Sequence, residues 1–300
     1  MSDPIGDLAD TVHVKSDQAE FRDYFRKWFV GILPALLDDT VVNHEILVLI
    51  GEQGLYKTTW FNFLLPPELR CYFYTKTNSD RLNKDDLFSL TEFALICFEE
   101  LDGMRPAELN QLKAMVTMPY VNERAAYGRN KERHPHIASF CGTGNNVQFL
   151  TDPTGNRRWL PFEVSQIRDP HLHAIPYELV YSQAYALWKS GFCHWFSQEE
   201  IRKLNMHNSR FEVPNLEEDL IRTHFRKPFE GEAGIFVTAA DILEQISSCL
   251  RYPLSPNKIG RIMAGLEVES IRYNGKRGYI AVKKTGEDID RERRSGALGL

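Results

Sequence analysis

The chain has 300 residues, of which 43% are hydrophobic and 26% are charged, and its formal net charge is −5. This composition excludes a disordered chain, a collagen-like repeat and a coiled-coil rod, and the length allows two compact domains. The negative net charge excludes a uniformly basic nucleic-acid coat, although it is compatible with a local basic channel.

The N-terminus and the cysteines indicate a cytoplasmic protein. The chain begins with MSDP, without the basic region and apolar stretch of a secretory signal. The apolar run 46–50 is far too short to span a bilayer. The five cysteines (71, 97, 141, 193 and 249) are widely spaced and include no CxxC pair, so we expect neither a zinc cage nor a disulfide framework.

The first part of the chain predicts an α/β fold with a parallel sheet. A helix is expected over residues 17–37, where apolar side chains recur at helical spacing and Pro34 fits a stop. Apolar runs that alternate with helical stretches predict buried strands at 45–50, 93–98, 137–142 and 159–164. We therefore expect an N-terminal helical extension (1–40) followed by an α/β core (41–168).

The remainder predicts a helical connector and a small second domain. Helices are expected at 177–188 and 199–208 within a lid or connector (169–232). Two helices (238–249 and 256–266) then precede two strands (268–273 and 278–282), and Asn274-Gly275 between these strands is a strong hairpin signal. This order is that of a winged helix-turn-helix (233–284), followed by a charged tail (285–300) expected to be disordered.

Residues 51–59, with the sequence GEQGLYKTT, lie between a predicted strand and a predicted helix, as a phosphate-binding loop requires. Glycines allow backbone N–H groups to surround a triphosphate at the N-terminus of a helix. Lys57 would reach the phosphates of ATP, and the Thr58 hydroxyl would bind Mg²⁺. Tyr56 stands where a glycine is usual. The alternative is a glycine-rich turn that binds nothing. The expected nucleotide-binding residues are Gly51, Gly54, Tyr56, Lys57, Thr58 and Thr59.

Acidic, amide and arginine side chains follow the other predicted strands. Glu99 would hold Mg²⁺ through water and Glu100 would polarise the attacking water, with Asp102 as a third candidate. Alternatively, the two glutamates begin a solvated helix. Asn145 follows the next strand and suits a sensor of the γ-phosphate. Arg157 and Arg158 suit an arginine finger, or else form intramolecular salt bridges.

Taken together, these motifs resemble the virulence-associated E ATPases, which are related to superfamily 3 helicases with an AAA+-like core. The resemblance covers about residues 20–210 and includes 112–114, 142–146 and 154–158. It implies bacterial or phage origin, a ring oligomer that is typically a hexamer, and ATP sites between subunits. It also implies Walker A roles for Lys57 and Thr58, Walker B roles for Glu99 and Glu100, and a sensor role for Asn145. Arg158 is then the trans-acting finger, with Arg157 beside it.

Two segments carry candidate nucleic-acid contacts. Residues 122–133 read as an exposed basic hairpin, which in the resembling helicases faces a central channel, or as a solvated loop. The second segment is the winged unit, which could instead dock a protein. Lys113 is also expected to face the central channel or to lie near the nucleotide. The expected contacts are Arg124, Tyr127, Arg129, Lys131 and Arg133 in the hairpin, and Lys258, Arg261, Lys276 and Arg277 in the winged unit.

The sequence thus predicts an ATP- and Mg²⁺-dependent DNA helicase or translocase that replicates a phage or mobile element. Its expected partners are single-stranded or forked DNA, further copies of the chain in a ring, and a primase in trans, with no membrane. One alternative is an ATP-switched DNA-binding initiator or scaffold with weak hydrolysis, which Tyr56 favours. The other is an AAA+-like ATPase that remodels protein partners.

Overall fold

The computed structural model describes residues 2–77, 84–123, 132–151, 156–214, 216–229, 231–247 and 254–294. It divides into two compact units, Met1–Val213 and Pro214–Leu300, each of which is described by itself. No described helix is both long enough and apolar enough to pass through a bilayer.

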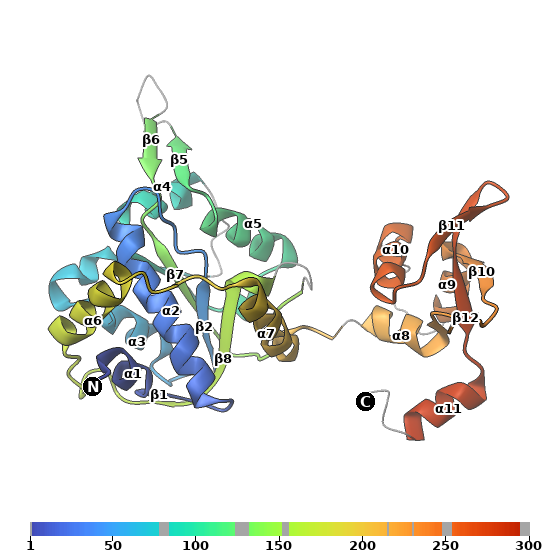
Figure 1. Cartoon of the computed structure of the whole chain (residues 1–300), viewed down its shortest axis with the longest axis horizontal. Coiled ribbons are helices and arrows are strands. Elements are labelled where there is room, and N and C mark those ends of the chain that lie inside the picture. The colour runs from blue at the N-terminus through green and yellow to red at the C-terminus, as the bar shows by residue number, and fades with distance from the viewer. Residues whose placement is uncertain are drawn as a thin grey trace. The chain divides into compact units, whose positions relative to one another are not determined.

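A six-stranded sheet with the order β1-β8-β2-β7-β4-β3 forms the centre of the first unit (Figure 1). Its strands β2, β7, β4, β3 and β8 run parallel, and β1 is antiparallel to β8 at one edge. The predicted mixed α/β fold with a mostly parallel sheet is therefore confirmed. The strand bounds are β1 Val12–Val14, β2 Ile46–Ile50, β3 Phe73–Lys76, β4 Leu95–Phe98, β7 Ser139–Gly144 and β8 Trp159–Ile167.

Helices cover both faces of this sheet, and strand β2 shows why. All five of its residues are buried, and alternate side chains enter two separate apolar clusters: Leu47 and Leu49 enter one, and Ile46, Val48 and Ile50 the other. The first cluster is closed by α1 (Pro4–Ala9), α2 (Gln18–Leu37), α3 (Lys57–Phe63), α6 (Tyr177–Lys189) and α7 (Gln198–Asn208). The second is closed by α4 (Lys84–Glu92) and α5 (Pro106–Val116).

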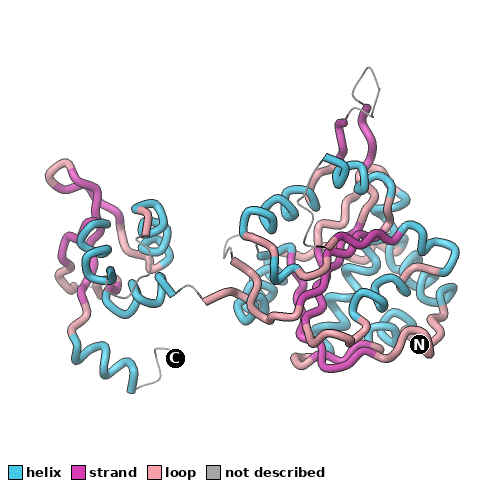
Figure 2. Tube along the Cα trace, turned by 180° about the vertical axis from the view of Figure 1, so that it is seen from behind, coloured by secondary structure: helices cyan, strands magenta, loops and turns pink. Residues whose placement is uncertain are grey.

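A separate antiparallel pair, β5 (Tyr120–Glu123) and β6 (Glu132–Pro135), extends away from the body of the first unit in both views (Figures 1 and 2). These strands are the ends of the hairpin predicted over 122–133. The residues that join them, 124–131, lie outside the described residues.

The first unit differs from the expected boundaries at both ends. Residues 1–40 are an integral part of the core, because α1 and α2 bury aromatic and aliphatic side chains against the sheet. Helix α2 also continues past Pro34, which is itself buried, and ends at Leu37. At the other end, α6 and α7 pack on the same cluster, so this part of the predicted connector belongs to the first unit.

The second unit has its own apolar core and a sheet in which β12 (Lys276–Lys283) pairs with β10 (Ile235–Thr238), β11 (Ser270–Tyr273) and β9 (Phe225–Arg226). Helices α8 (Leu216–His224), α9 (Ala239–Ile246) and α10 (Pro256–Gly265) pack on it, so α8 and β9 belong here and not to a connector. Residues 286–294 form helix α11 (Gly286–Arg294), although the sequence predicted disorder from 285. Acidic residues in the first turn of this helix favour it.

Candidate nucleotide-binding site

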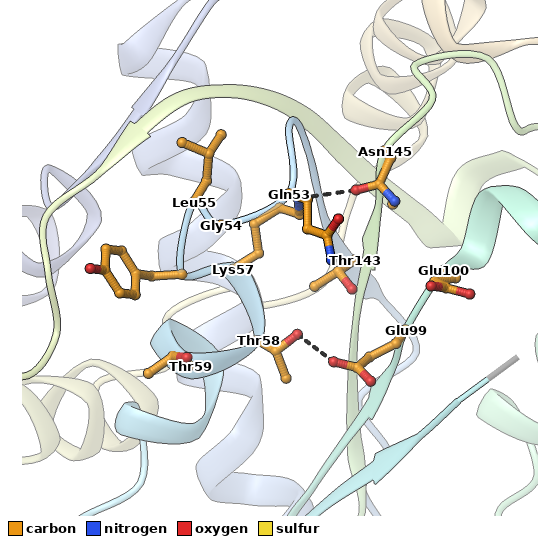
Figure 3. Close-up of a pocket in the computed structure, with 12 residues that line it drawn as sticks. Gln53, Gly54, Leu55, Lys57, Thr58, Thr59, Glu99, Glu100, Thr143 and Asn145 are labelled. Atoms are coloured by element: carbon orange, nitrogen blue, oxygen red, sulfur yellow. Dashed lines mark hydrogen bonds between the residues drawn. The ribbon is translucent and has the colours of Figure 1, made fainter.

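The loop between β2 and α3 borders a cavity of about 470 Å³ at the carboxyl ends of β2, β4 and β7 (Figure 3). This edge is where ligands bind in open parallel sheets. The lining residues come from three segments and include most of the predicted nucleotide and catalytic residues: Gln53, Gly54, Leu55, Tyr56, Lys57, Thr58, Thr59, Glu99, Glu100, Thr143, Gly144 and Asn145.

Lys57 begins α3 and turns back into the loop. Its ammonium donates hydrogen bonds to the carbonyls of Gly51 (2.6 Å) and Glu52 (2.8 Å), and it lies 3.5 Å from Asn145 Oδ1. Only 8% of the residue is exposed. Burial lowers the pKa of Lys57, and the negative charge of Asp102 opposes this shift. A cation is thus held in a sheltered position where phosphate oxygens would be its strongest acceptors.

Thr58 and Glu99 face each other across the floor of the cavity (Figure 3). The threonine hydroxyl donates a 2.8 Å hydrogen bond to Glu99 Oε1. Hydroxyl and carboxylate oxygens are the ligands that Mg²⁺ prefers. The pair lies next to Lys57, so the donor set fits a magnesium ion bound together with a phosphate. No cluster of three or more His, Cys, Asp or Glu side chains suited to a metal occurs among the described residues.

Asn145 is held in place by Asp102, which the sequence suggested only as a third acidic candidate. The Asp102 carboxylate accepts hydrogen bonds from the backbone N–H groups of Asn145 and Asn146, both at 3.1 Å, and from the Asn146 amide at 2.8 Å. Gly144 allows this close approach, since a Cβ there would lie 3.0 Å from Asp102 Oδ1. Asp102 therefore acts as a positioning residue for the loop that presents Asn145.

Two non-glycine residues with left-handed backbone border the cavity. Tyr56 has φ 61° and Glu100 has φ 55°. Left-handed backbone is uncommon for side chains of this size and costs about 1–2 kcal/mol. Such outliers concentrate at functional sites. Tyr56 stands at the position where the phosphate-loop pattern has glycine, and its side chain is 41% exposed, so the ring is accommodated at the surface.

The arginine pair lies at the amino ends of the parallel strands, opposite the carboxyl ends that border the cavity. Arg157 and Arg158 precede β8, whose first residue Trp159 is in register with Ile46, the first residue of β2. Lys57 follows the far end of β2, about 15 Å of strand away. Neither arginine lines the cavity of its own chain. Burial and the charge of Arg157 lower the pKa of Arg158, which Glu45 opposes.

A buried amide fixes the turn that carries these arginines. Asn208 is fully buried, and its amide donates to the carbonyls of Asn156 (2.8 Å) and Trp159 (3.0 Å), the two residues that flank the pair. The Asn156 side chain donates in turn to Glu212 (2.8 Å). Asn208 has no local sequence signal, because the contact joins residues about fifty positions apart.

The predicted nucleic-acid residues are distributed over both units. Arg124, Tyr127, Arg129 and Lys131 lie outside the described residues. Arg133, on β6, places its guanidinium 3.3 Å from the centre of the Tyr120 ring. Lys113 is buried on α5 and does not line the cavity.

In the second unit, Lys258 forms a 2.7 Å ion pair with Glu217, while Arg261, Lys276 and Arg277 are exposed.

Comparison with protein families matches residues 3–213 to the virulence-associated protein E-like domain. The match spans all but the first two residues of the first unit, including the loop, the acidic pair, Asn145 and the arginine pair. The chain belongs to the virulence-associated protein E-like family. The family resemblance seen in the sequence is therefore confirmed, and it extends N-terminally beyond the expected start near residue 20.

The solved structures similar to this family member include the apo structure of the NrS-1 C-terminal region (305–718), at 13% identity and a TM-score of 0.49. A second, the A form of the same apo region, has 12% identity and a TM-score of 0.48. Each similarity covers 95% of this chain and 76% of the other. The comparison with curated proteins gave no match.

Proposed function

We propose that this member of the virulence-associated protein E-like family is a Mg²⁺-dependent ATPase that moves on DNA, in replication of a phage or mobile element. The observation that carries the proposal is the meeting of Lys57, Thr58, Glu99 and Asn145 around one cavity at the carboxyl edge of a parallel sheet. A cation, a hydroxyl–carboxylate pair and an amide are what binding and cleavage of a phosphoanhydride require.

Each side chain has a role that follows from its position. Lys57 would exchange its bonds to the Gly51 and Glu52 carbonyls for bonds to the β- and γ-phosphate oxygens of ATP. Thr58 and Glu99 would hold the magnesium ion, which when bound withdraws charge from the phosphates. Glu100 would orient the attacking water and accept its proton. The Asn145 amide would donate to the γ-phosphate and report its presence.

The placement of the arginine pair supports a shared site. An arginine at the opposite edge of the sheet cannot reach the nucleotide of its own chain, whereas a ring of identical subunits can bring it to the neighbouring cavity. Arg158 would then stabilise the charge that builds on the γ-phosphate, a contribution of about 10³–10⁵ in rate for such fingers. Nucleotide turnover in one subunit would thereby depend on the next.

Mixing two inactive variants tests this arrangement. Lys57→Ala and Arg158→Ala are each expected to lack ATP hydrolysis alone. In mixed oligomers, an Arg158→Ala subunit supplies an intact cavity and its Lys57→Ala neighbour supplies the arginine, so activity should return. The matched control mixes Lys57→Ala with Glu99→Ala. Both substitutions disable the nucleotide site of their own subunit, so this mixture should recover no ATP hydrolysis. Equal, absent activity in both mixtures would refute a site completed in trans.

Tyr56 favours a second candidate function. A left-handed tyrosine in the phosphate loop suits a protein that binds ATP as a switch and hydrolyses it weakly while bound to DNA. Tight ATP binding with no DNA-stimulated phosphate release would favour this candidate over the motor.

A further inference from the structure

The hairpin of the second unit, formed by β11 and β12, is unusually basic. Residues 270–277 (SIRYNGKR) include three basic and no acidic side chains, within a chain whose net charge is −5. Asn274 (φ 50°) and Gly275 (φ 75°) both adopt the positive φ of a tight two-residue turn, which confirms the predicted hairpin. In Figure 1 the hairpin extends beyond the helices of this unit.

The arginines of this hairpin are placed against each other. Arg272 and Arg277 are direct cross-strand partners, both exposed, and like charges in this arrangement repel. Arg277 Nε donates a 3.0 Å hydrogen bond to Ser270 Oγ, which fixes its direction. Among the described residues, the salt bridges of this unit lie elsewhere, at Arg222–Glu218, Arg226–Glu232, Lys227–Glu267 and Lys258–Glu217. An anion bound between the two guanidinium groups would relieve this repulsion.

An exposed aromatic ring accompanies these charges. Tyr273 is 59% exposed and is the cross-strand partner of Lys276, so the two side chains share one face of the hairpin. The Phe236 ring supports Tyr273 at a centroid distance of 5.5 Å. Gly278 makes room for Phe236, because a Cβ there would lie 2.5 Å from that ring. The Tyr273 ring is thus supported from within the unit and lies on the same face of the hairpin as the Lys276 ammonium group.

Helix α10, which carries the predicted nucleic-acid contacts Lys258 and Arg261, is less suited to nucleic acid. Lys258 forms an ion pair with Glu217 at 2.7 Å. Arg261 is exposed and forms no such ion pair among the described residues. Binding of duplex DNA by this helix would require breaking an existing ion pair. In the hairpin, Arg272, Lys276 and Arg277 form no ion pair among the described residues. The charge of Lys276 does reach Asp241, whose pKa is lowered by hydrogen bonds from Thr238 and also by this lysine.

We infer that the β11–β12 hairpin is a binding surface for single-stranded nucleic acid. An unpaired base stacks on Tyr273, Lys276 contacts the adjacent phosphate, and Arg272 and Arg277 bind phosphates on the other face of the ribbon. Stacking on an aromatic ring requires a base that is free of its duplex partner, so the surface selects single strands. This inference rests on the DNA substrate of the proposed function and names the surface that binds it.

Binding of a fluorescent oligothymidine to the full chain, without nucleotide and over a series of salt concentrations, tests the inference. Tyr273→Ala should weaken binding about 5- to 100-fold, while Tyr273→Phe should preserve it. Arg272→Gln combined with Arg277→Gln should lower the slope of log affinity against log salt by about 1.4. The matched control on α10, Lys258→Gln combined with Arg261→Gln, should change affinity less than twofold. All four proteins should unfold at the same temperature as the wild type.

Three results would overturn the inference: Tyr273→Ala within twofold of wild type, equal losses in the α10 control and the hairpin variant, or tighter binding of a duplex that does not depend on Tyr273. Failure of the proposed function is distinguishable, because Lys57→Ala is expected to bind the oligonucleotide normally. Tyr273-dependent binding by a wild-type chain that releases no phosphate would preserve this inference and refute the motor.

Discussion

Asp102→Asn is expected to slow ATP hydrolysis without unfolding the protein. The Asp102 carboxylate accepts three hydrogen bonds from the segment that presents Asn145. Asparagine replaces one carboxylate oxygen by an NH₂ group, which can only donate a hydrogen bond. This NH₂ group would face an N–H donor of the Asn145 segment. One or two of the three bonds are lost, and Asn145 loses its fixed position over the cavity.

The size of the effect follows from those bonds. Hydrogen bonds to charged groups contribute about 1.5–3 kcal/mol each. Because this loop is partly exposed and water can replace part of what is lost, we expect the loss of one or two bonds to cost about 1.5–3 kcal/mol in total. Since about 1.4 kcal/mol corresponds to a factor of ten, the fraction of correctly placed Asn145 should fall about 10- to 100-fold. The maximal rate should fall by the same factor, and no further than it falls in Asn145→Ala.

Steady-state phosphate release at saturating single-stranded DNA measures this, with the double variant Asp102→Asn, Asn145→Ala included. If Asp102 acts through Asn145, the double variant is no slower than Asn145→Ala alone. Asp241→Asn is the matched control, because Asp241 caps α9 through Thr238 in the second unit, with bonds of 2.7 and 2.8 Å. Full activity of Asp102→Asn, or additive losses in the double variant, would refute the positioning role.

Three further predictions concern other parts of the first unit. Tyr56→Gly should leave the free energy of unfolding within about 1 kcal/mol of the wild-type value, because relief of left-handed strain is offset by the greater freedom of glycine in the unfolded chain. The rate of phosphate release should stay within twofold of wild type. A tenfold gain in this rate would show that the tyrosine restrains hydrolysis. Burial raises the pKa of Glu45 from 4.5 to about 7, so the contribution of this group to stability is fully present below pH 4.5 and is lost as the pH rises through 7. The free energy of unfolding in urea should therefore fall over this pH range in the wild type. If Glu45→Gln shows the same dependence of the free energy of unfolding on pH, the assignment is wrong. Asn208→Ala leaves two buried carbonyls without their donor and should cost about 2–4 kcal/mol, or about 4–16 °C in Tm, whereas the exposed control Asn205→Ala should shift Tm little.

Much of the sheet was predictable because buried parallel strands are continuous apolar runs. The run at β2 begins within one residue of its predicted start, and β8 begins at the predicted Trp159. Strands β1 and β3 were not predicted, since each is only three or four residues long and partly exposed, and carries no distinctive pattern. The domain boundaries differ for a related reason: whether α8 packs on the first or the second unit depends on contacts distant in sequence.

The candidate site was predictable where it is local and not where it depends on register. Lys57 and Thr58 are adjacent in one loop, and Glu99 directly follows a strand, so their neighbourhood follows from parallel topology. The location of Arg158 follows only from the pairing of Trp159 with Ile46, which no sequence pattern reports. The role of Asp102 likewise depends on two loops meeting in space.

Phosphate release by the purified chain, with and without single-stranded DNA and beside Lys57→Ala, tests the central claim most directly. We expect ATP hydrolysis that DNA stimulates and that Lys57→Ala abolishes, while this variant keeps the wild-type unfolding temperature to within a few degrees. Phosphate release that persists in Lys57→Ala, or that is absent from the wild type with and without DNA, would contradict an ATP-driven motor at this cavity.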